Sequence, residues 1–126
     1  MELDAADVYR RVTQAFTSGD RDTLLELIAE DVVWHTDDLQ VNVPSEFRGR
    51  DAFFGASSTP RDHITEWEIT PFKVVSQGKT AFSHQIDRFV LKDGTEHIVH
   101  LLLHIEINDQ GQLSEVWEFG QSAIPH

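Results

Sequence analysis

The sequence predicts an α+β fold in which helices come first and a mostly antiparallel sheet follows. Apolar residues recur every three or four positions between residues 4 and 28, which is the spacing of a buried helix face. From Ile64 onward, apolar and polar residues alternate as they do in half-buried strands. A glycine stands in each turn between these strand-like runs, at Gly78, Gly94 and Gly111, and Asp93 directly precedes Gly94, which favours hairpins. With 126 residues, the chain has room for one domain, expected to span residues 1–126.

Two helices are expected at the N-terminus. Asp4 can cap a helix that runs to about Ser18, because its carboxylate accepts an otherwise unpaired backbone N–H. Gly19 supplies the left-handed residue that ends this helix, and Asp20 caps a second, short one. The residues expected on the buried faces are Val8, Val12, Ala15, Phe16, Leu24, Leu27 and Ile28. The segments expected next are a strand at Asp31–His35, a polar loop over Thr36–Arg48 and the start of a third helix at Gly49–Phe54.

Four strands are expected in the second half, at Ile64–Ser76, Thr80–Leu91, Glu96–Ile107 and Leu113–Phe119. Asp93-Gly94 is typical of a two-residue hairpin turn, whose central residues both need positive φ. If Lys92 then pairs with Thr95, the numbers of facing residues sum to 187. This register places His84, Arg88 and His97 on the same apolar face as Leu101 and Leu103, which we expect to be the concave, helix-covered face. It places Asp87 opposite His100 on the convex face, where the pair would make a dimer interface sensitive to pH.

The composition excludes several classes of function. Ten basic residues against 22 acidic ones give a net charge of −12, which disfavours nucleic acids and anionic membranes as partners. There is no cysteine, so disulfides, thiol nucleophiles and cysteine-based zinc sites are excluded. Neither a secretory signal nor an apolar run of membrane-spanning length is present, and we therefore expect a cytoplasmic protein.

Four motifs, in this order and spacing, resemble the NTF2-like superfamily in its SnoaL-like and ketosteroid-isomerase-like branch. They are Ser18-Gly19-Asp20, Glu30–Trp34, Phe47–Ala52 and Gly111–Phe119. The resemblance implies a cystatin-like or NTF2-like cone, in which a curved sheet wraps around the N-terminal helices and encloses a pocket. It also implies a homodimer formed through the outer face of the sheet.

The catalytic sites of the best-known members are not conserved by this chain. The isomerase tyrosine falls on Val12, its general base on Thr36 and its protonated acid on Leu103. The Arg-x-Asp pair of epoxide hydrolases is missing from Glu96–Ile107, and Gln121 stands where the cyclases commonly carry an acidic residue. Since a fold does not determine a function, the resemblance implies a pocket without an inherited mechanism.

Two residues are candidates for catalysis. His84 would lie deep on the apolar face, where an imidazole acts as a general base or holds a polar substrate atom; the alternative is a structural histidine. Asp37 lies one residue beyond the family's base position, where burial would raise the pKa of a carboxylate. The alternative is that Asp37 and Asp38 are both solvated loop residues.

A larger set is expected to line the pocket: Val12, Phe16, Trp34, Phe54, Leu101, Leu103, Glu115 and Trp117. Glu115 and Trp117 depend on the register of the last strand, because a one-residue change near Gly111 would turn both outward. Arg88 and His97 are expected at the pocket mouth, where an arginine binds an anionic group or forms a structural ion pair.

No metal and no cofactor are expected. His100 and His104 lie about 13 Å apart on a strand, which is too far for one ion. The chain also lacks a dinucleotide-binding motif and a P-loop.

Three functions remain open. The first is a cofactor-independent acid/base enzyme of the isomerase, cyclase or dehydratase type, acting on an apolar, carbonyl-bearing substrate. It requires a closed pocket in which at least two polar groups converge within hydrogen-bond reach, and one strongly shifted pKa. The second is a small-molecule-binding domain, which requires an apolar cavity with at most one polar anchor. The third is a dimeric scaffold with no cavity of ligand size.

Overall fold

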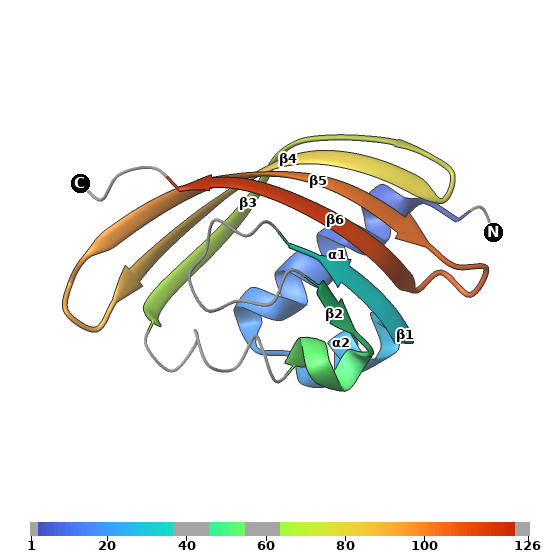
Figure 1. The fold of residues 1–126 in the computed structure, drawn as a ribbon, viewed down its shortest axis with the longest axis horizontal. Coiled ribbons are helices and arrows are strands. Elements are labelled where there is room, and N and C mark those ends of the chain that lie inside the picture. The colour runs from blue at the N-terminus through green and yellow to red at the C-terminus, as the bar shows by residue number, and fades with distance from the viewer. Residues whose placement is uncertain (1–2, 37–45, 55–63, 123–126) are drawn as a thin grey trace.

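The computed structural model describes residues 3–36, 46–54 and 64–122. Its elements are α1 (Ala5–Ser18), α2 (Arg21–Leu27), β1 (Ile28–His35), β2 (Glu46–Arg48), β3 (Ile64–Gln77), β4 (Thr80–Leu91), β5 (Glu96–Ile107) and β6 (Leu113–Ser122). Residues 50–54 are helical as well. The four long strands β3 to β6 form an arch, and α1 lies beneath it (Figure 1).

All six strands belong to one sheet, in the order β2-β1-β6-β5-β4-β3. Every neighbouring pair is antiparallel except β1 and β6, which are parallel. The α+β class and the curved, mostly antiparallel sheet predicted from the sequence are therefore confirmed. One difference is at β2, which lies within the loop expected over Thr36–Arg48. Its three residues pair with β1, with Val33 opposite Arg48.

The helix ends form as their capping residues predict. The Asp4 carboxylate accepts from the backbone N–H of Ala6 over 2.9 Å, and Gly19 ends α1 with φ 73°. Asp20 caps α2 by accepting from the N–H of Thr23. The second helix is shorter than expected, because Ile28 already has extended backbone and begins β1.

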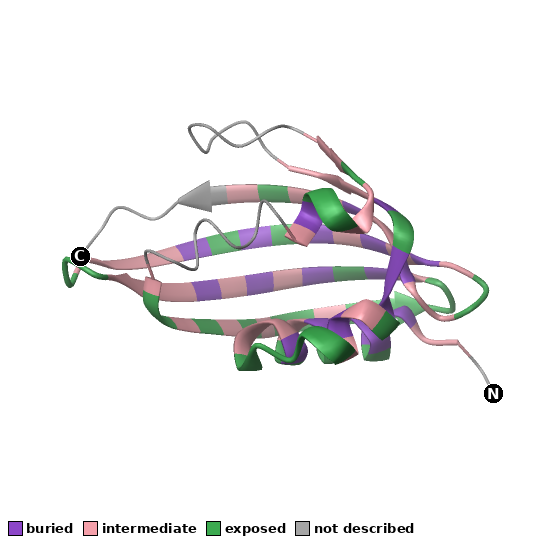
Figure 2. Cartoon of the chain, turned by 90° about the horizontal axis from the view of Figure 1, so that it is seen from below, coloured by how far each residue is buried: buried purple, intermediate pink, exposed green. Residues whose placement is uncertain are grey.

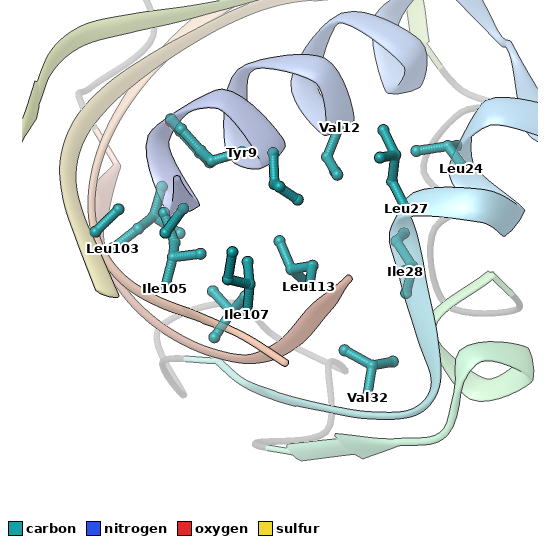
Figure 3. Close-up of a cluster of buried hydrophobic side chains, with 14 of the residues drawn as sticks. Tyr9, Val12, Leu24, Leu27, Ile28, Val32, Leu103, Ile105, Ile107 and Leu113 are labelled. Atoms are coloured by element: carbon teal, nitrogen blue, oxygen red, sulfur yellow. The ribbon is translucent and has the colours of Figure 1, made fainter. Parts of the chain in front are cut away.

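The core lies between the helices and the concave face of the sheet. Side chains from α1, α2, β1 and the ends of β5 and β6 converge there, as Figure 3 shows for Tyr9, Leu27, Val32, Ile105 and Leu113. Along the strands, buried residues alternate with less buried ones (Figure 2). This period of two means that each strand presents alternate residues to the inside and outside of the cone.

The hairpin between β4 and β5 differs from its prediction by one residue. Thr80 faces Glu106 and Val90 faces Glu96, so the numbers of facing residues sum to 186 rather than 187. The connection is a three-residue loop in which Gly94, at φ 88°, donates its N–H to the Leu91 carbonyl, and Leu91 donates to Thr95. Only Gly94 has the positive φ, as in a type I turn followed by a glycine bulge.

This single-residue difference reverses the two faces of β4. The inner residues are Ala81, Ser83, Gln85, Asp87 and Phe89, whereas β5 presents Val99, Leu101, Leu103 and Ile105 as expected. Asp87 therefore faces Val99 on the inside, and the expected pairing of Asp87 with His100 is wrong.

The register of β6 also changes within the strand. Ile107 faces Leu113, but Glu106 faces Glu115, so Ser114 is an extra residue at a β-bulge. Beyond the bulge, Val116 is buried while Glu115 and Trp117 turn to the outer face. The expectation that Glu115 and Trp117 line the pocket is corrected for this reason.

The outer face of the sheet carries exposed apolar side chains. Phe72, Val75, Phe82, Leu102 and Phe119 are all more than half exposed, from 52% to 67%. A row of stacked rings crosses four strands beside them, formed by Phe82, His104, Trp117 and His35. Within the described ranges, no helix is long and apolar enough to cross a membrane.

Candidate functional site

A cavity of about 420 Å³ lies between α1 and the concave face of the sheet. Most of its lining is apolar or aromatic. The lining residues on the helix and the first strand include Tyr9, Val12, Thr13, Phe16 and Trp34, and those on β3 to β6 include Trp67, Gln85, Asp87, Phe89, Leu101, Leu103, Val116 and Glu118. A cavity of this size holds a small organic ligand.

A chain of hydrogen bonds runs along one wall of this cavity. Ser83 Oγ donates to the Tyr9 hydroxyl over 2.9 Å, and the Tyr9 hydroxyl donates to Gln85 Oε1 over 2.6 Å. The Gln85 amide nitrogen then donates to Asp87 Oδ1 over 2.6 Å, and the Trp67 indole N–H lies 3.4 Å from Asp87 Oδ2. Residues of three elements, α1, β3 and β4, are thus linked in one hydrogen-bond network that ends at the Asp87 carboxylate.

Asp87 is the ionisable group at the end of this chain and is only 7% exposed. Burial raises its pKa above the ordinary value, because the charged carboxylate loses hydration, and the hydrogen bonds from Gln85 and Trp67 oppose part of this rise. Among the described residues, none of the ion pairs involves Asp87. The site therefore holds a buried acid whose described partners are all neutral.

Tyr9 contributes a second polar group to the same wall. Burial is the largest cause that raises the pKa of Tyr9 well above its usual range, and the nearby Asp87 charge adds to it. The phenol therefore keeps its proton and acts as a hydrogen-bond donor. Its position on α1, three residues before Val12, places it one helical turn from the position at which the isomerases carry their tyrosine.

Aromatic rings form two groups around the cavity. Trp67 packs against Phe16 at 5.0 Å between ring centroids and against Phe89 at 6.2 Å, next to Asp87. Trp34 stacks on Phe53 at 4.8 Å on the other side of the lining. Phe53 takes the place expected for Phe54, whose ring instead packs under the guanidinium of Arg21.

His84 lies outside the cavity. The corrected register of β4 turns it to the outer face, where its Nε2 lies 2.9 Å from Nδ1 of His100 and its ring contacts Phe72. A ligand held in the cavity cannot contact His84, so the expectation that this histidine faces the pocket is corrected. The remaining catalytic candidate, Asp37, lies outside the described residues.

The two residues expected at the pocket mouth, Arg88 and His97, lie on opposite faces of the sheet. Arg88 turns to the outer face with His84 and forms ion pairs with Glu66, Glu68 and Glu96. These bonds raise the pKa of Arg88, the hydrogen bond to Glu96 most of all. His97 stays near the cavity, since its ring stacks on the lining residue Phe89 at 5.2 Å.

Sequence reasoning missed the polar wall of Ser83, Gln85 and Asp87. The sequence does contain a signal, because these three polar residues stand at every second position of the strand and therefore share one face. The assumed two-residue turn assigned that face to the solvent side. The resemblance implies the position of Val12, three residues later on the same helix, and therefore does not single out Tyr9.

The described part of the chain holds no group of three or more His, Cys, Asp or Glu side chains that could bind a metal ion. The polar wall of the cavity has one carboxylate with neutral neighbours, which is suited to proton transfer rather than to coordination.

Many solved structures share this fold, and three of them illustrate its range. The chain matches IdmH of Streptomyces antibioticus, a candidate polyketide cyclase, with a TM-score of 0.80 and 22% identity over 93% of this chain and 91% of that one. An LEH-like epoxide hydrolase from Mycobacterium tuberculosis gives a TM-score of 0.73 and 15% identity over 93% of this chain and 82% of that one. A computationally designed binder of 17-OHP gives 0.76 and 17% over 94% and 98%. At these identities the likeness shows the fold alone.

Sequence comparison identifies the family. No curated protein resembles the chain closely enough in sequence to count as a match. The family model described as a SnoaL-like domain matches residues 9–116, which include most of α1, strands β1 to β5, the start of β6 and nearly all of the cavity lining. The chain is therefore a member of the SnoaL-like domain family, with the NTF2-like, ketosteroid-isomerase-like fold.

Proposed function

We propose that this protein is a cofactor-independent acid/base enzyme, of the isomerase, cyclase or dehydratase type, that acts on an apolar, carbonyl-bearing small molecule. The observation that carries the proposal is the buried carboxylate of Asp87 in the wall of an apolar cavity. Asp87 exchanges a proton with the bound molecule, and the cavity excludes the water that would compete for that proton.

Two features of the cavity favour an enzyme, namely its converging polar groups and a shifted pKa. The cavity has the volume of a ligand site, and the polar groups of Tyr9, Gln85 and Asp87 converge on one wall of it. The raised pKa of Asp87 supports the same conclusion, since a carboxyl group transfers protons best when its pKa is closer to the working pH.

The alternative is a binding domain without chemistry. It is favoured by one observation. Tyr9 and Gln85 already hydrogen-bond to each other, which leaves Asp87 as the main polar group that can anchor a ligand. The designed 17-OHP binder is an example of this fold used for binding. A scaffold with a filled interior is disfavoured by the cavity of about 420 Å³.

The experiment that tests catalysis does not require the natural substrate. A panel of cyclic ketones is incubated with the protein in D₂O, and deuterium at the carbon next to the carbonyl is followed by NMR. We expect protein-dependent exchange with at least one ketone, reduced about 100-fold or more in Asp87→Asn, as for loss of a general acid/base. Asp31→Asn removes an exposed carboxylate outside the cavity lining and is the matched control.

One result decides against the enzyme and a second decides against the role of Asp87. If ketones bind in the cavity without any exchange above the solvent rate, the binding domain is the correct function. If exchange occurs at the same rate in Asp87→Asn, another residue transfers the proton.

We also propose that two copies of the chain pair through the outer face of the sheet. The supporting observation is the set of apolar side chains exposed there, among which Leu102 and Phe119 face each other across β5 and β6. A monomer rarely leaves such a set in contact with water.

A further inference from the structure

We propose that the cavity recognises positive charge: it binds an apolar molecule with a compact cationic centre, held between the Asp87 carboxylate and the rings of Phe16, Trp67 and Phe89. The inference rests on the proposed function in one respect, namely that a carbonyl-bearing substrate becomes such a cation when it accepts a proton from Asp87.

The first argument is the charge balance at Asp87. A buried carboxylate is normally paired with a cation, because the loss of hydration is costly without one. Its hydrogen-bond partners in the described structure are the Gln85 amide and the Trp67 indole, and both are neutral. Two things can neutralise this group: a proton, which makes it a neutral acid, or a cationic centre brought by the ligand.

The second argument is the aromatic wall beside the carboxylate. Trp67 connects the two features, because its N–H points to Asp87 while its ring packs against Phe16 and Phe89. The ring planes meet at 87° and 54°, so the three rings are not parallel, and all three residues line the cavity. The negative electrostatic potential of such faces attracts a cation, most strongly for tryptophan and in a desolvated site.

The third argument is the type of charge that the lining carries. Asp87 and Glu118 are its ionisable acids, and no Lys, Arg or His is present among the described lining residues. An anionic ligand would therefore meet the buried Asp87 carboxylate in a medium of low dielectric constant, where repulsion is strong. A cationic ligand meets attraction from the same group.

A preference for positive charge in the cavity also agrees with the proposed proton transfer. The O–H bond of the Asp87 carboxylic acid breaks as a new O–H bond forms on the carbonyl oxygen of the substrate. The substrate then carries one positive charge beside the Asp87 carboxylate and the three rings. When the carbon next to the carbonyl loses a proton to that carboxylate, the enol forms and Asp87 regains its acid form, so atoms and charge balance.

The test uses two probes of the same shape. Benzyltrimethylammonium is a permanent cation, and neopentylbenzene has a carbon atom in place of its nitrogen. Binding to the full chain is measured by NMR titration of the tryptophan indole N–H signals, among which that of Trp67 reports on the site. We expect the cation to bind about tenfold tighter or more, the scale of a desolvated cation–π contact with an added counter-charge.

The pH dependence supplies a signature that needs no variant. The cation binds the ionised form of Asp87, so its affinity rises with pH through the titration of that group and then levels off. The neutral probe buries Asp87 further and favours its protonated form, so its affinity falls over the same range. Opposite slopes for the two probes are the expected result in wild-type protein.

Variants identify the group responsible. In Asp87→Asn, both pH profiles become flat and the preference for the cation falls about tenfold. In Asp31→Asn, which loses the same charge from an exposed position, the preference is unchanged. The proposal is overturned if wild-type protein binds the two probes equally, if it prefers the neutral probe at every pH, if neither probe binds, or if Asp87→Asn keeps the preference.

These results are separable from those of the exchange experiment. A protein that catalyses Asp87-dependent exchange but shows no preference for the cationic probe keeps its proposed function and loses this inference. A protein that prefers the cation but exchanges no ketone is a cation-binding domain instead.

Discussion

Gln85 and Asp87 lie two residues apart on β4, and the Gln85 amide donates to the Asp87 carboxylate over 2.6 Å. Side chains at i and i+2 of a strand share a face, so this contact is local in sequence. Its direction is nevertheless set from α1, because Gln85 Oε1 accepts from the Tyr9 hydroxyl and the nitrogen must therefore face Asp87. Tyr9 on α1 thus orients the Gln85 amide, and this amide donates to the Asp87 carboxylate on β4.

Removing the Tyr9 hydroxyl tests this arrangement. In Tyr9→Phe, the Gln85 amide loses the donor that holds its orientation, the carboxylate loses part of its stabilisation, and the pKa of Asp87 moves further up. The buried groups left without a partner lower the free energy of unfolding by about 1–3 kcal/mol. Urea denaturation measures the stability, and ¹³C NMR of the Asp87 carboxyl measures the titration. An unchanged titration would show that Gln85 keeps its orientation without Tyr9.

Asp87→Asn is expected to stabilise the fold at neutral pH. The pKa of Asp87 is higher in the folded protein than its ordinary value of 3.8, so the folded state holds a proton that the unfolded state releases. The corresponding stability is present below pH 3.8 and is lost as pH rises through the folded pKa. Thermal unfolding of both proteins across this range should show a difference in Tm that grows with pH. A constant difference would point to packing rather than ionisation.

The proposed dimer is tested at Leu102, which is 58% exposed on the outer face. Leu102→Glu places a charge among apolar neighbours, where burial of an unpaired charge is costly, and shifts the protein to the monomer. Light scattering coupled to size-exclusion chromatography measures the mass. Gln110→Glu, in an exposed turn, adds the same charge and should leave the mass unchanged. A monomeric wild type would refute the pairing.

Ile105 measures the contribution of the core. It is fully buried on the concave face of β5, at 0% exposure. Ile105→Val should lower the free energy of unfolding by about 0.5–1.5 kcal/mol and Ile105→Ala by about 2–5 kcal/mol, since the larger deletion leaves a cavity. Denaturant titration checks both values. Equal effects of the two substitutions would mean that the neighbouring side chains collapse into the space.

Much of the fold could be predicted from local chemistry. Asp4 and Gly19 bound α1 because a capping carboxylate and a left-handed glycine act within one turn of the chain. The spans of β4 and β5, Thr80–Leu91 and Glu96–Ile107, follow from residue alternation and from the turn between them. Such features need no partner from elsewhere in the molecule, so the sequence by itself determined them.

The site was decided by tertiary structure. A strand has a period of two, so one extra residue in the loop before Thr95, or one at Ser114, exchanges its inner and outer faces. Both loops are compatible with Asp93-Gly94, and the choice between them depends on which face of β4 packs against α1. That packing turns Asp87 inward and His84 outward, and it brings Tyr9 to Gln85 across 76 residues of sequence. The sequence alone determined that β4 carries a polar face; only packing against the helix decided that this face lines the cavity.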